Sequence, residues 1–335
     1  MRAVVSDQPG GPETLRVTDG FEIPHPGPGE VRVRVRAASL NFPDLLRIED
    51  KYQQRVARPF VPGSEAAGEI DALGEGVTGI AVGSRVMAMT EIGALAEYVC
   101  VPAHRATAIP DDMPFDEAAA LMVTYGTSWH ALTKRADLKA DETLLVLAAS
   151  GGVGLAAVEI GKALGARVIA AVSTPEKGDV ASAAGADAVV IYPSGPLDMA
   201  AQKEMSQSFK AAVGPEGASV VFDPVGGDYA IPAFRAIGWD GRYLVVGFAA
   251  GIADMPMNLP LLKGASVLGV FWGASVERDP EGHRAAMTDI LSLYSAGDIR
   301  PRIHGRWPLD EAPRAMTLLG GRGAIGKLVI EVAQV

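Results

Sequence analysis

Cysteine is nearly absent from this sequence of 335 residues, which holds only one. A single thiol cannot form a disulfide within the chain, a zinc lobe of four cysteines or an iron–sulfur cluster. Long apolar runs are also missing: no stretch approaches the roughly 18 consecutive apolar residues of a membrane helix. The first fifteen residues contain no apolar segment of the signal-peptide type. We therefore expect a cytoplasmic protein without a membrane partner.

Positive charge is scarce as well. Lys and Arg number 30 against 40 Asp and Glu, which gives a net charge of −10. Because non-specific nucleic-acid binding depends on neutralising phosphates, this balance argues against a nucleic-acid partner. Hydrophobic residues make up 48% of the chain, enough for a sizeable core. The length predicts about two domains, and a small-molecule substrate is the best initial expectation.

The character of the sequence changes near residue 120. Before it, short β-type runs alternate with Gly and Pro, and residues 31–36 alternate strictly, as in a half-buried strand. The three Arg residues of that run share one face, which we interpret as solvated. Beyond it, Ala-rich helical stretches separate short apolar runs, a pattern typical of a parallel sheet covered on both faces. The runs span 143–148, 167–172, 188–191, 219–222 and 243–247.

A glycine-rich turn at 145–154 leads from an apolar run into a helical stretch. Read as G-x-G-x-x-G, it has Ala149 at the first position, followed by Gly151 and Gly154. The first position makes a tight turn, the second lets a pyrophosphate approach the backbone, and the third lets helix pack closely on strand. The helix then offers unpaired N–H groups to an anion. The turn therefore predicts a dinucleotide site in a doubly wound α/β domain.

The end of the second apolar run bears on which dinucleotide binds. NAD sites usually carry Asp or Glu there, but this chain has Ser173, with Lys177 one turn later. A hydroxyl and an ammonium favour a 2′-phosphate, and hence NADP. The same segment also has the pattern of a helix N-cap, and Glu176 could turn toward a ribose.

Several motifs occur in a fixed order along the chain. They lie at 41–44, 62–68, 124–132, 148–154, 223–227, 246–248, 271–273 and 322–327. Together they resemble the medium-chain dehydrogenase/reductase superfamily. More narrowly, the chain looks like the zinc-free quinone oxidoreductase branch, related to zeta-crystallin, and the resemblance covers essentially the whole sequence. It implies a GroES-like β-rich catalytic domain, residues 1–122 and 264–335, with a Rossmann NADP-binding domain, residues 123–263, inserted.

Zinc alcohol dehydrogenases of this superfamily hold their catalytic zinc through two Cys and a His. Here the position of the first Cys is Asn41, and their Gly-His-Glu reads Gly63, Ser64, Glu65. We therefore expect no metal. Without zinc, reduction of a quinone or conjugated carbonyl is favoured, because the anion formed needs only a hydrogen-bond donor or water to receive a proton. The expected site is a mostly apolar cleft between the domains.

The resemblance also implies residue roles. It places Asn41 and Tyr52 on the substrate side and Thr127 at the nicotinamide end, as the catalytic set. Tyr52 either donates a proton or packs over its loop. The implied cofactor contacts are Thr124, the pyrophosphate turn Gly151, Gly152, Val153 and Gly154, the 2′-phosphate group Ser173, Lys177 and Tyr192, the nicotinamide border Phe248, Phe271, Trp272 and Gly273, and Arg322 at the phosphates or adenine. Residues 271–272 also suit a sheet edge in a homodimer.

Other functions remain open beside quinone reduction. A 2-enoyl-thioester or other enone reductase would use the same fold and cofactor, and a non-enzymatic NADPH-binding protein would keep the cofactor site alone. A serine hydrolase built on Ser150 is disfavoured, since no βα units precede it. Residues 321–327 match a P-loop until Leu328, but they lead into a strand and are rejected. His130 is interpreted as a packed residue.

Overall fold

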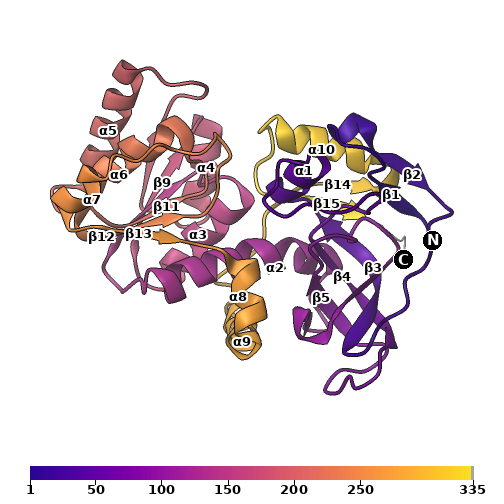
Figure 1. Cartoon of the computed structure of the whole chain (residues 1–335). Coiled ribbons are helices and arrows are strands. Elements are labelled where there is room, and N and C mark those ends of the chain that lie inside the picture. The colour runs from indigo at the N-terminus through magenta and orange to yellow at the C-terminus, as the bar shows by residue number, and fades with distance from the viewer. Residues whose placement is uncertain (333–335) are drawn as a thin grey trace. The chain divides into compact units, whose positions relative to one another are not determined.

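The computed structural model describes residues 1–332 and divides into two compact units (Figure 1). Unit 1 holds Met1–Val123, Asp279–Met287 and the chain from Pro301, and unit 2 holds Thr124–Arg278 and Thr288–Arg300. The chain first passes from unit 1 to unit 2 inside helix α2 (Phe115–Trp129), and helix α9 (Pro280–Ala296) contributes to both. The β-rich fold of unit 1 is interrupted by the α/β fold of unit 2, the architecture of a GroES-like domain with an inserted Rossmann domain.

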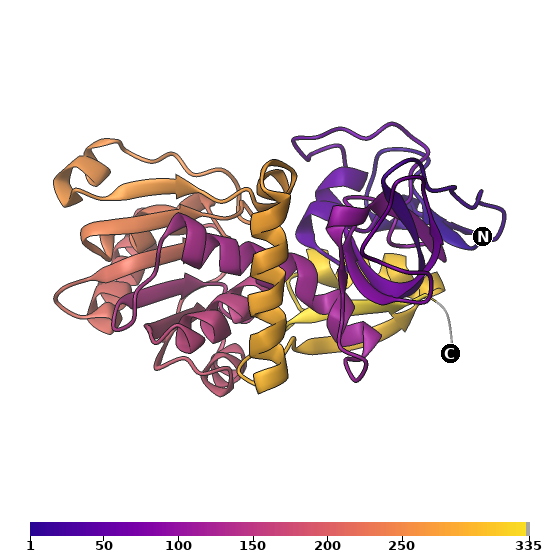
Figure 2. The ribbon, with the colours of Figure 1, turned by 90° about the horizontal axis from the view of Figure 1, so that it is seen from below.

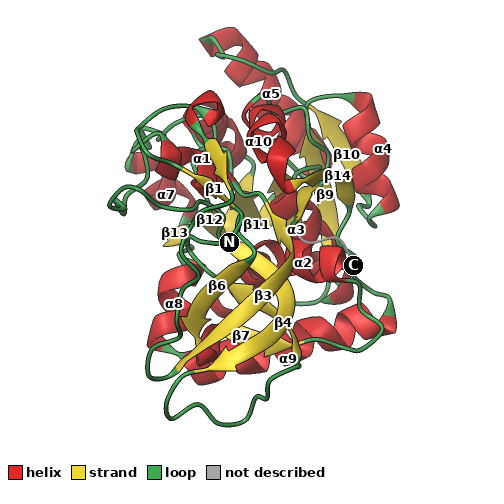
Figure 3. Cartoon of the chain, turned by 90° about the vertical axis from the view of Figure 1, so that its right-hand side faces the viewer, coloured by secondary structure: helices red, strands yellow, loops and turns green. Residues whose placement is uncertain are grey.

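Unit 1 is built on a curved sheet in the order β14-β15-β3-β4-β5-β7, with β6 also paired to β3 (Figure 3). A separate pair, β1 (Ala3–Val5) and β2 (Arg16–Thr18), is antiparallel. The short helices α1 (Phe42–Ile48) and α10 (Ala312–Gly320) complete the unit. The strands of the sheet are β3 (Glu30–Ser39), β4 (Glu65–Leu73), β5 (Arg85–Met89), β6 (Tyr98–Pro102), β7 (Ala106–Ala108), β14 (Ile303–Pro308) and β15 (Lys327–Glu331).

Strand β3 shows why the alternating sequence folds this way. Its valines are fully buried, and its arginines lie on the opposite face. Arg32 donates two hydrogen bonds to Asp71 of the neighbouring strand β4, and Arg36 pairs with Glu69. These arginines therefore stabilise the sheet through cross-strand ion pairs, which explains the basic face without a ligand.

Unit 2 is built on a parallel sheet in the order β10-β9-β8-β11-β12-β13. Numbered along the chain, this is 3-2-1-4-5-6, the order of a Rossmann fold. Figure 2 shows the strands side by side with helices packed along the sheet. The strands are β8 (Thr143–Leu147), β9 (Arg167–Val172), β10 (Ala188–Ile191), β11 (Ala218–Asp223), β12 (Ile237–Val245) and β13 (Ser266–Gly269); the helices are α3 (Gly152–Ala163), α4 (Pro175–Ala183), α5 (Met199–Val213), α6 (Ala230–Arg235), α7 (Asn258–Lys263) and α8 (Trp272–Arg278).

The second expected domain boundary, between residues 263 and 264, differs from the structure. Strand β13 pairs with β12 in the parallel sheet, and unit 2 continues to Arg278. A short strand with Ser266 and Val267 exposed carries little of the apolar signal of the inner strands. The sequence therefore did not separate it from the β-type segments of unit 1.

Glu159 of α3 lies where unit 2 begins and ends. Its Oε2 accepts a hydrogen bond from the Tyr125 hydroxyl at 2.5 Å and from the backbone N–H of Arg300 at 3.1 Å. Burial raises the pKa of this carboxyl to about 7. In residues 1–332, no helix has both the length and the apolar character of a membrane span.

Candidate functional site

The predicted cofactor residues of unit 2 gather at one edge of its sheet. In a Rossmann fold, ligands bind at the carboxyl ends of the strands where the strand order reverses, which here lies between β8 and β11. Because parallel strands end at the same edge, the residues directly after them share it. Residues 151–154 follow β8, Ser173 follows β9, Tyr192 follows β10, Phe248 follows β12, and residues 271–273 follow β13. The topology therefore brings this part of the predicted set together.

The turn after β8 is held by close backbone packing. A Cβ on Gly154 would lie 2.2 Å from the carbonyl oxygen of Ala148, so only glycine fits there. The residue with left-handed backbone is Ala148, with φ 48°, one position before the Ala149 to which the motif assigned the tight turn. A Cβ on Gly151 would meet only an ordinary contact, at 3.5 Å. Gly154 is thus required by the protein itself, whereas Gly151 leaves room for an approaching ligand.

Helix α3 gives this turn its electrostatic character. Gly151 is the N-cap residue, and the helix begins at Gly152. The first N–H groups of any α-helix lack partners within the helix, and the helix dipole makes this end positive. Ser128 of α2 donates a hydrogen bond to the carbonyl oxygen of Val153 at 2.9 Å, which fixes the first turn. Residues 151–154 therefore form a cradle that fits the pyrophosphate of a dinucleotide.

A hydroxyl and an ammonium meet at the end of β9. Lys177 Nζ donates to Ser173 Oγ at 3.1 Å. Thr174 caps helix α4 by accepting from the Lys177 backbone N–H, so the N-cap interpretation also holds. A hydrogen bond with the Thr174 side chain lowers the pKa of Glu176, which places that carboxylate at the helix cap. The end of β9 thus presents a positive group beside a hydroxyl.

The aromatic residues predicted at the cofactor differ in burial. Tyr192 packs in the core, with its ring centroid 5.3 Å from that of Tyr229 and 6.4 Å from that of Phe209. Trp272 is 7% exposed, and a Cβ on Gly126 of α2 would lie 2.5 Å from its indole. Phe248 and Phe271, by contrast, are 42% and 54% exposed.

Two threonines of α2 and one glycine of α8 belong to the same predicted set. Thr124 is buried at 2% exposure, and Thr127 is partly exposed. Gly273 has open space where a side chain would lie, so nothing within the protein requires glycine there. His130 lies in the helical turn after α2, where burial and the neighbouring cations Arg135 and Lys134 lower its pKa.

Unit 1 contains a buried charged cluster that the sequence did not reveal. Lys327 Nζ donates to Glu65 Oε1 at 2.8 Å, to Asn41 Oδ1 at 2.6 Å and to the Leu40 carbonyl at 2.9 Å. The second carboxylate oxygen of Glu65 accepts from the Val123 backbone N–H at 2.7 Å. Glu65 is fully buried and Lys327 is 4% exposed. The available signal was a charged residue at the start of each of two apolar strands, β4 and β15.

The cluster includes Asn41 and Ser64, the two residues that the resemblance predicts at zinc-ligand positions of the alcohol dehydrogenases. Asn41 Nδ2 donates to Glu65 Oε1 at 2.8 Å and to Ser64 Oγ at 3.2 Å, while its Oδ1 faces the Lys327 ammonium. An ammonium at these oxygens would repel a second cation, and neither amide nor hydroxyl is a preferred zinc donor. The donor set therefore does not fit zinc. Among residues 1–332, no three His, Cys, Asp or Glu side chains lie close enough together to hold a metal ion.

A series of side-chain contacts along α1 connects Asn41 of this cluster to Tyr52. The backbone N–H of Asn41 donates to Asp44 Oδ2 at 2.8 Å, and burial raises the pKa of Asp44 to about 6. Arg47 Nη1 lies 3.8 Å from Asp44 Oδ1, and the guanidinium carbon lies 4.5 Å from the centre of the Tyr52 ring. The Tyr52 ring is thus placed by a cation–π contact. Arg322, the remaining predicted residue, is exposed in the turn after α10, with left-handed backbone.

Two protein families match the chain by sequence. The family described as zinc-binding dehydrogenase matches residues 152–289, and the alcohol dehydrogenase GroES-like domain matches residues 27–111. The quinone oxidoreductase-like protein 2 of Bos taurus is 37% identical over 91% of this chain and 86% of its own length. The homologue of that protein in Nematostella vectensis is 34% identical over 99% of this chain and 89% of its own length.

A solved structure with a bound cofactor is similar over the whole chain. Mycobacterial Rv1454c, solved in complex with NADPH, is 29% identical, covers 99% of this chain and 100% of its own, and superposes with a TM-score of 0.91. The similarity therefore extends over both units, and the fold agrees.

Proposed function

We propose that this chain, which belongs to the medium-chain dehydrogenase/reductase superfamily, is an NADPH-dependent oxidoreductase that works without zinc and reduces quinones or related conjugated carbonyl compounds. The observation that carries this proposal is the Lys327 ammonium, which donates to Asn41 and Glu65 in the buried cluster that contains the predicted positions of two zinc ligands, Asn41 and Ser64. Alcohol oxidation in this superfamily relies on a metal to stabilise the alkoxide. A quinone or enone demands less, because its anion is already delocalised.

The cofactor assignment rests on the carboxyl edge of unit 2. NADPH, when bound, supplies a hydride. The α3 cradle at residues 151–154 binds the pyrophosphate, and Lys177 with Ser173 binds the 2′-phosphate through charge-assisted hydrogen bonds. Thr124 and Thr127 of α2, together with Phe248, Phe271, Trp272 and Gly273, border the nicotinamide, and Tyr192 supports the 2′-phosphate group from the core. Arg322 of unit 1 stays the predicted contact of the phosphates or adenine.

The substrate assignment rests on unit 1. The Tyr52 hydroxyl donates a hydrogen bond to the oxygen of the reduced substrate. Arg47 holds the Tyr52 ring in position through its cation–π contact. Both amide hydrogens of Asn41 are already used by Glu65 and Ser64. Asn41 therefore acts by holding Lys327 and Glu65 in place rather than by taking up substrate charge itself.

A homodimer accompanies this function. Strand β13 is an edge of the parallel sheet, and within residues 1–332 its one strand partner is β12. Val267 on this strand is 46% exposed and Trp239 is 74% exposed. An exposed strand edge with apolar side chains is suited to pair with the same edge of a second copy. Light scattering of the purified chain measures this assembly directly.

A matrix of cofactors and acceptors tests the proposal. NADH and NADPH are each combined with quinones, enones and 2-enoyl thioesters, and nicotinamide oxidation is followed by absorbance. Fast turnover of quinones or simple enones with NADPH, resistant to a metal chelator, is the expected result. Preference for NADH would contradict the role of Ser173 and Lys177.

Two other outcomes would replace the proposed activity. Turnover restricted to enoyl thioesters, with a large loss in Tyr52→Phe, would identify an enoyl-thioester reductase. Tight NADPH binding without oxidation by any acceptor would indicate a binding protein.

A further inference from the structure

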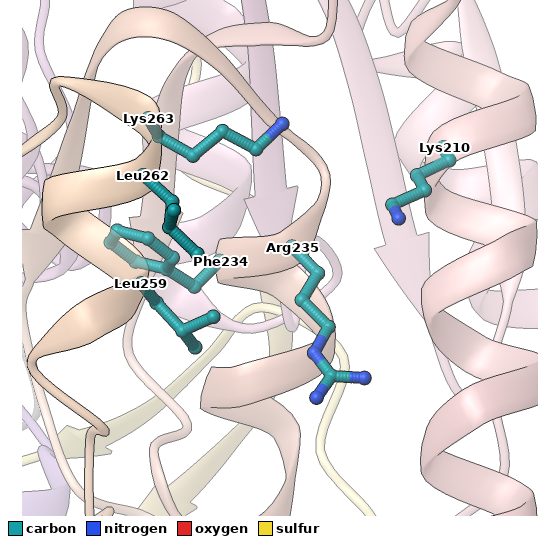
Figure 4. A pocket seen from close by; sticks show the side chains of 6 residues that line it. All are labelled: Lys210, Phe234, Arg235, Leu259, Leu262 and Lys263. Atoms are coloured by element: carbon teal, nitrogen blue, oxygen red, sulfur yellow. The ribbon is translucent and has the colours of Figure 1, made fainter.

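Two adjoining depressions lie on the helical layer of unit 2, outside the predicted cofactor edge. One, of about 310 Å³, lies between α5, α6 and α7 and is lined by Lys210, Phe234, Arg235, Leu259, Leu262 and Lys263 (Figure 4). The second, of about 280 Å³, lies between Met199 and Lys203 of α5 and Ile231 of α6. Arg235 borders both, so the two depressions adjoin, and we refer to them together as the groove.

The charge of this groove is unlike that of the chain. Four cations border it, Lys203, Lys210, Arg235 and Lys263, and among the described residues no Asp or Glu lines either depression. None of the four forms an ion pair with any residue between 1 and 332. Elsewhere the chain is acidic, with a net charge of −10, and many of its arginines pair with carboxylates. A local excess of unpaired positive charge is therefore a specific property of this surface.

Helix ends account for only part of this charge. Lys210, Arg235 and Lys263 lie in the last turns of α5, α6 and α7, where cations complement the helix dipole. Each helix end carries about half a negative charge, which offsets less than the full charge of its cation. Helix ends also do not explain an apolar wall. The three helices lead into β11, β12 and β13, so these cations lie toward the amino edge of the sheet, opposite the predicted cofactor edge.

The apolar side chains and two of these cations, Arg235 and Lys210, lie on opposite sides of the groove, whereas Lys263 lies beside Leu262 on α7 (Figure 4). Figure 4 shows Phe234, Leu259 and Leu262 gathered on one side, with Arg235 and Lys210 on the other. Phe234 is fully buried and forms the base, whereas Leu262 is 65% exposed. Met199 of the second depression is 88% exposed. An occupant that contacts both sides needs an apolar chain and an anionic group in one molecule.

We propose that this groove binds a free single-chain amphipathic anion, a medium- or long-chain fatty acid, with its alkyl chain on the apolar wall and its carboxylate among Lys210, Arg235 and Lys263. The volume is at the lower end of small-molecule sites, which span about 300 to 1,000 Å³. Such a site is too small for a folded partner, whose interface needs roughly 800 Å² on each side. The site is distinct from the proposed reductase site, and its occupation does not depend on the reaction.

Calorimetric titration of the whole chain with dodecanoate, below its micelle concentration, tests the proposal. Acetate carries the head without the tail, and dodecyltrimethylammonium carries the tail with the opposite charge. We expect saturable binding of one dodecanoate per chain and no binding of acetate or of the cationic amphiphile. Equal binding of both amphiphiles would show apolar adsorption and overturn the proposal.

Substitutions locate the binding to the groove. Lys210→Gln with Arg235→Gln removes two cations at exposed positions and is expected to weaken dodecanoate binding about tenfold or more, since charge-assisted hydrogen bonds are lost. Leu262→Ser is expected to weaken it less. Lys139→Gln, a cation of unit 2 that lines neither depression, is the matched control and is expected to leave binding unchanged. Circular dichroism of each variant verifies folding. Unchanged affinity in the folded double variant would place the ligand elsewhere.

A membrane surface is the competing occupant. Flotation with vesicles of phosphatidylcholine containing phosphatidylglycerol distinguishes it from a free fatty acid. Binding to vesicles without any binding of dodecanoate monomers would overturn the proposal in favour of an anionic lipid surface.

Discussion

The two units differ in whether their polar groups are satisfied within the protein. In unit 1, the Lys327 ammonium donates to three oxygens, and both carboxylate oxygens of Glu65 accept hydrogen bonds, so the cluster is complete without a ligand. At the carboxyl edge of unit 2, Gly151 and Gly273 leave space where a side chain would lie. A buried charge must be satisfied within the domain, whereas a ligand cradle is formed from donors and space that the domain leaves unused.

Breaking the unit 1 cluster should have the largest effect. Lys327→Met leaves the Glu65 carboxylate buried without its counter-charge, which is expected to lower the free energy of unfolding by about 3–5 kcal/mol. Urea denaturation measures this loss. The double variant Lys327→Met/Glu65→Gln should lose less than Lys327→Met alone.

A control for this prediction is the partly exposed pair on β3. Arg32→Met removes a cation paired with Asp71 and is expected to cost about 1 kcal/mol or less. If Lys327→Met costs no more than Arg32→Met, the cluster does not depend on its charge balance.

The two glycines of the α3 turn should separate stability from cofactor binding. Gly154→Ala forces a Cβ against the Ala148 carbonyl and is expected to destabilise the chain by about 1–3 kcal/mol. Gly151→Ala meets no close atom and should leave the melting temperature unchanged while raising the dissociation constant for NADPH. Thermal unfolding and fluorescence titration measure the two effects. Equal loss of stability in both variants would contradict the distinction.

Lys177 should determine the preference between cofactors. Lys177→Gln removes the ammonium beside Ser173 and is expected to weaken NADPH binding about tenfold, with little change for NADH. Glu176→Gln is the control, because a glutamate engaged at the Thr174 cap should leave both affinities unchanged. Weaker NADH binding in Glu176→Gln would instead mean that this carboxylate binds the ribose.

A pH-dependent change in the free energy of unfolding, of about 2 kcal/mol between pH 5 and 7, should arise at Glu159. Burial raises the pKa of its carboxyl in the folded chain to about 7, above the ordinary value of 4.5. At a pH between these two pKa values, the folded state keeps a proton that the unfolded state releases. The free energy of unfolding therefore falls as pH rises through this range. Glu159→Gln should flatten this slope, whereas Glu204→Gln, an exposed change in the same unit, should not.

The strands of unit 2 and its glycine-rich turn could be predicted from the sequence, because each depends on residues that are close together along the chain. The strands at 143–147, 167–172 and 188–191 are continuous apolar runs, and the turn at 145–154 carries its glycines at fixed spacing. These features depend on neighbouring residues, and the matches to the two families agree with them. The approach of Lys177 to Ser173 is of the same kind, since Ser173 lies just before the N-cap of α4 and Lys177 lies in its first turn.

The unit 1 cluster could not be predicted because it depends on distant pairing. Lys327 and Glu65 are 262 residues apart, and they meet because β15 and β4 both pair with β3. From the sequence, Lys327 belongs to a rejected phosphate-loop motif and Asn41 is predicted at the substrate. Neither pattern indicates which side chains these two residues contact. Likewise, the sequence treated residues 271–272 alike, whereas tertiary packing buries Trp272 against Gly126 and leaves Phe271 exposed.

The carboxyl group of Glu159 also concerns how this chain could be rearranged. It accepts one hydrogen bond from Tyr125, just after the first passage into unit 2, and another from Arg300, the last residue before the chain finally leaves it. One side chain thus brings together the beginning and end of a unit more than 170 residues apart in sequence. A domain whose two ends lie close together is suited to insertion into a loop of another protein, because the two ends of that loop need not move apart to accept it.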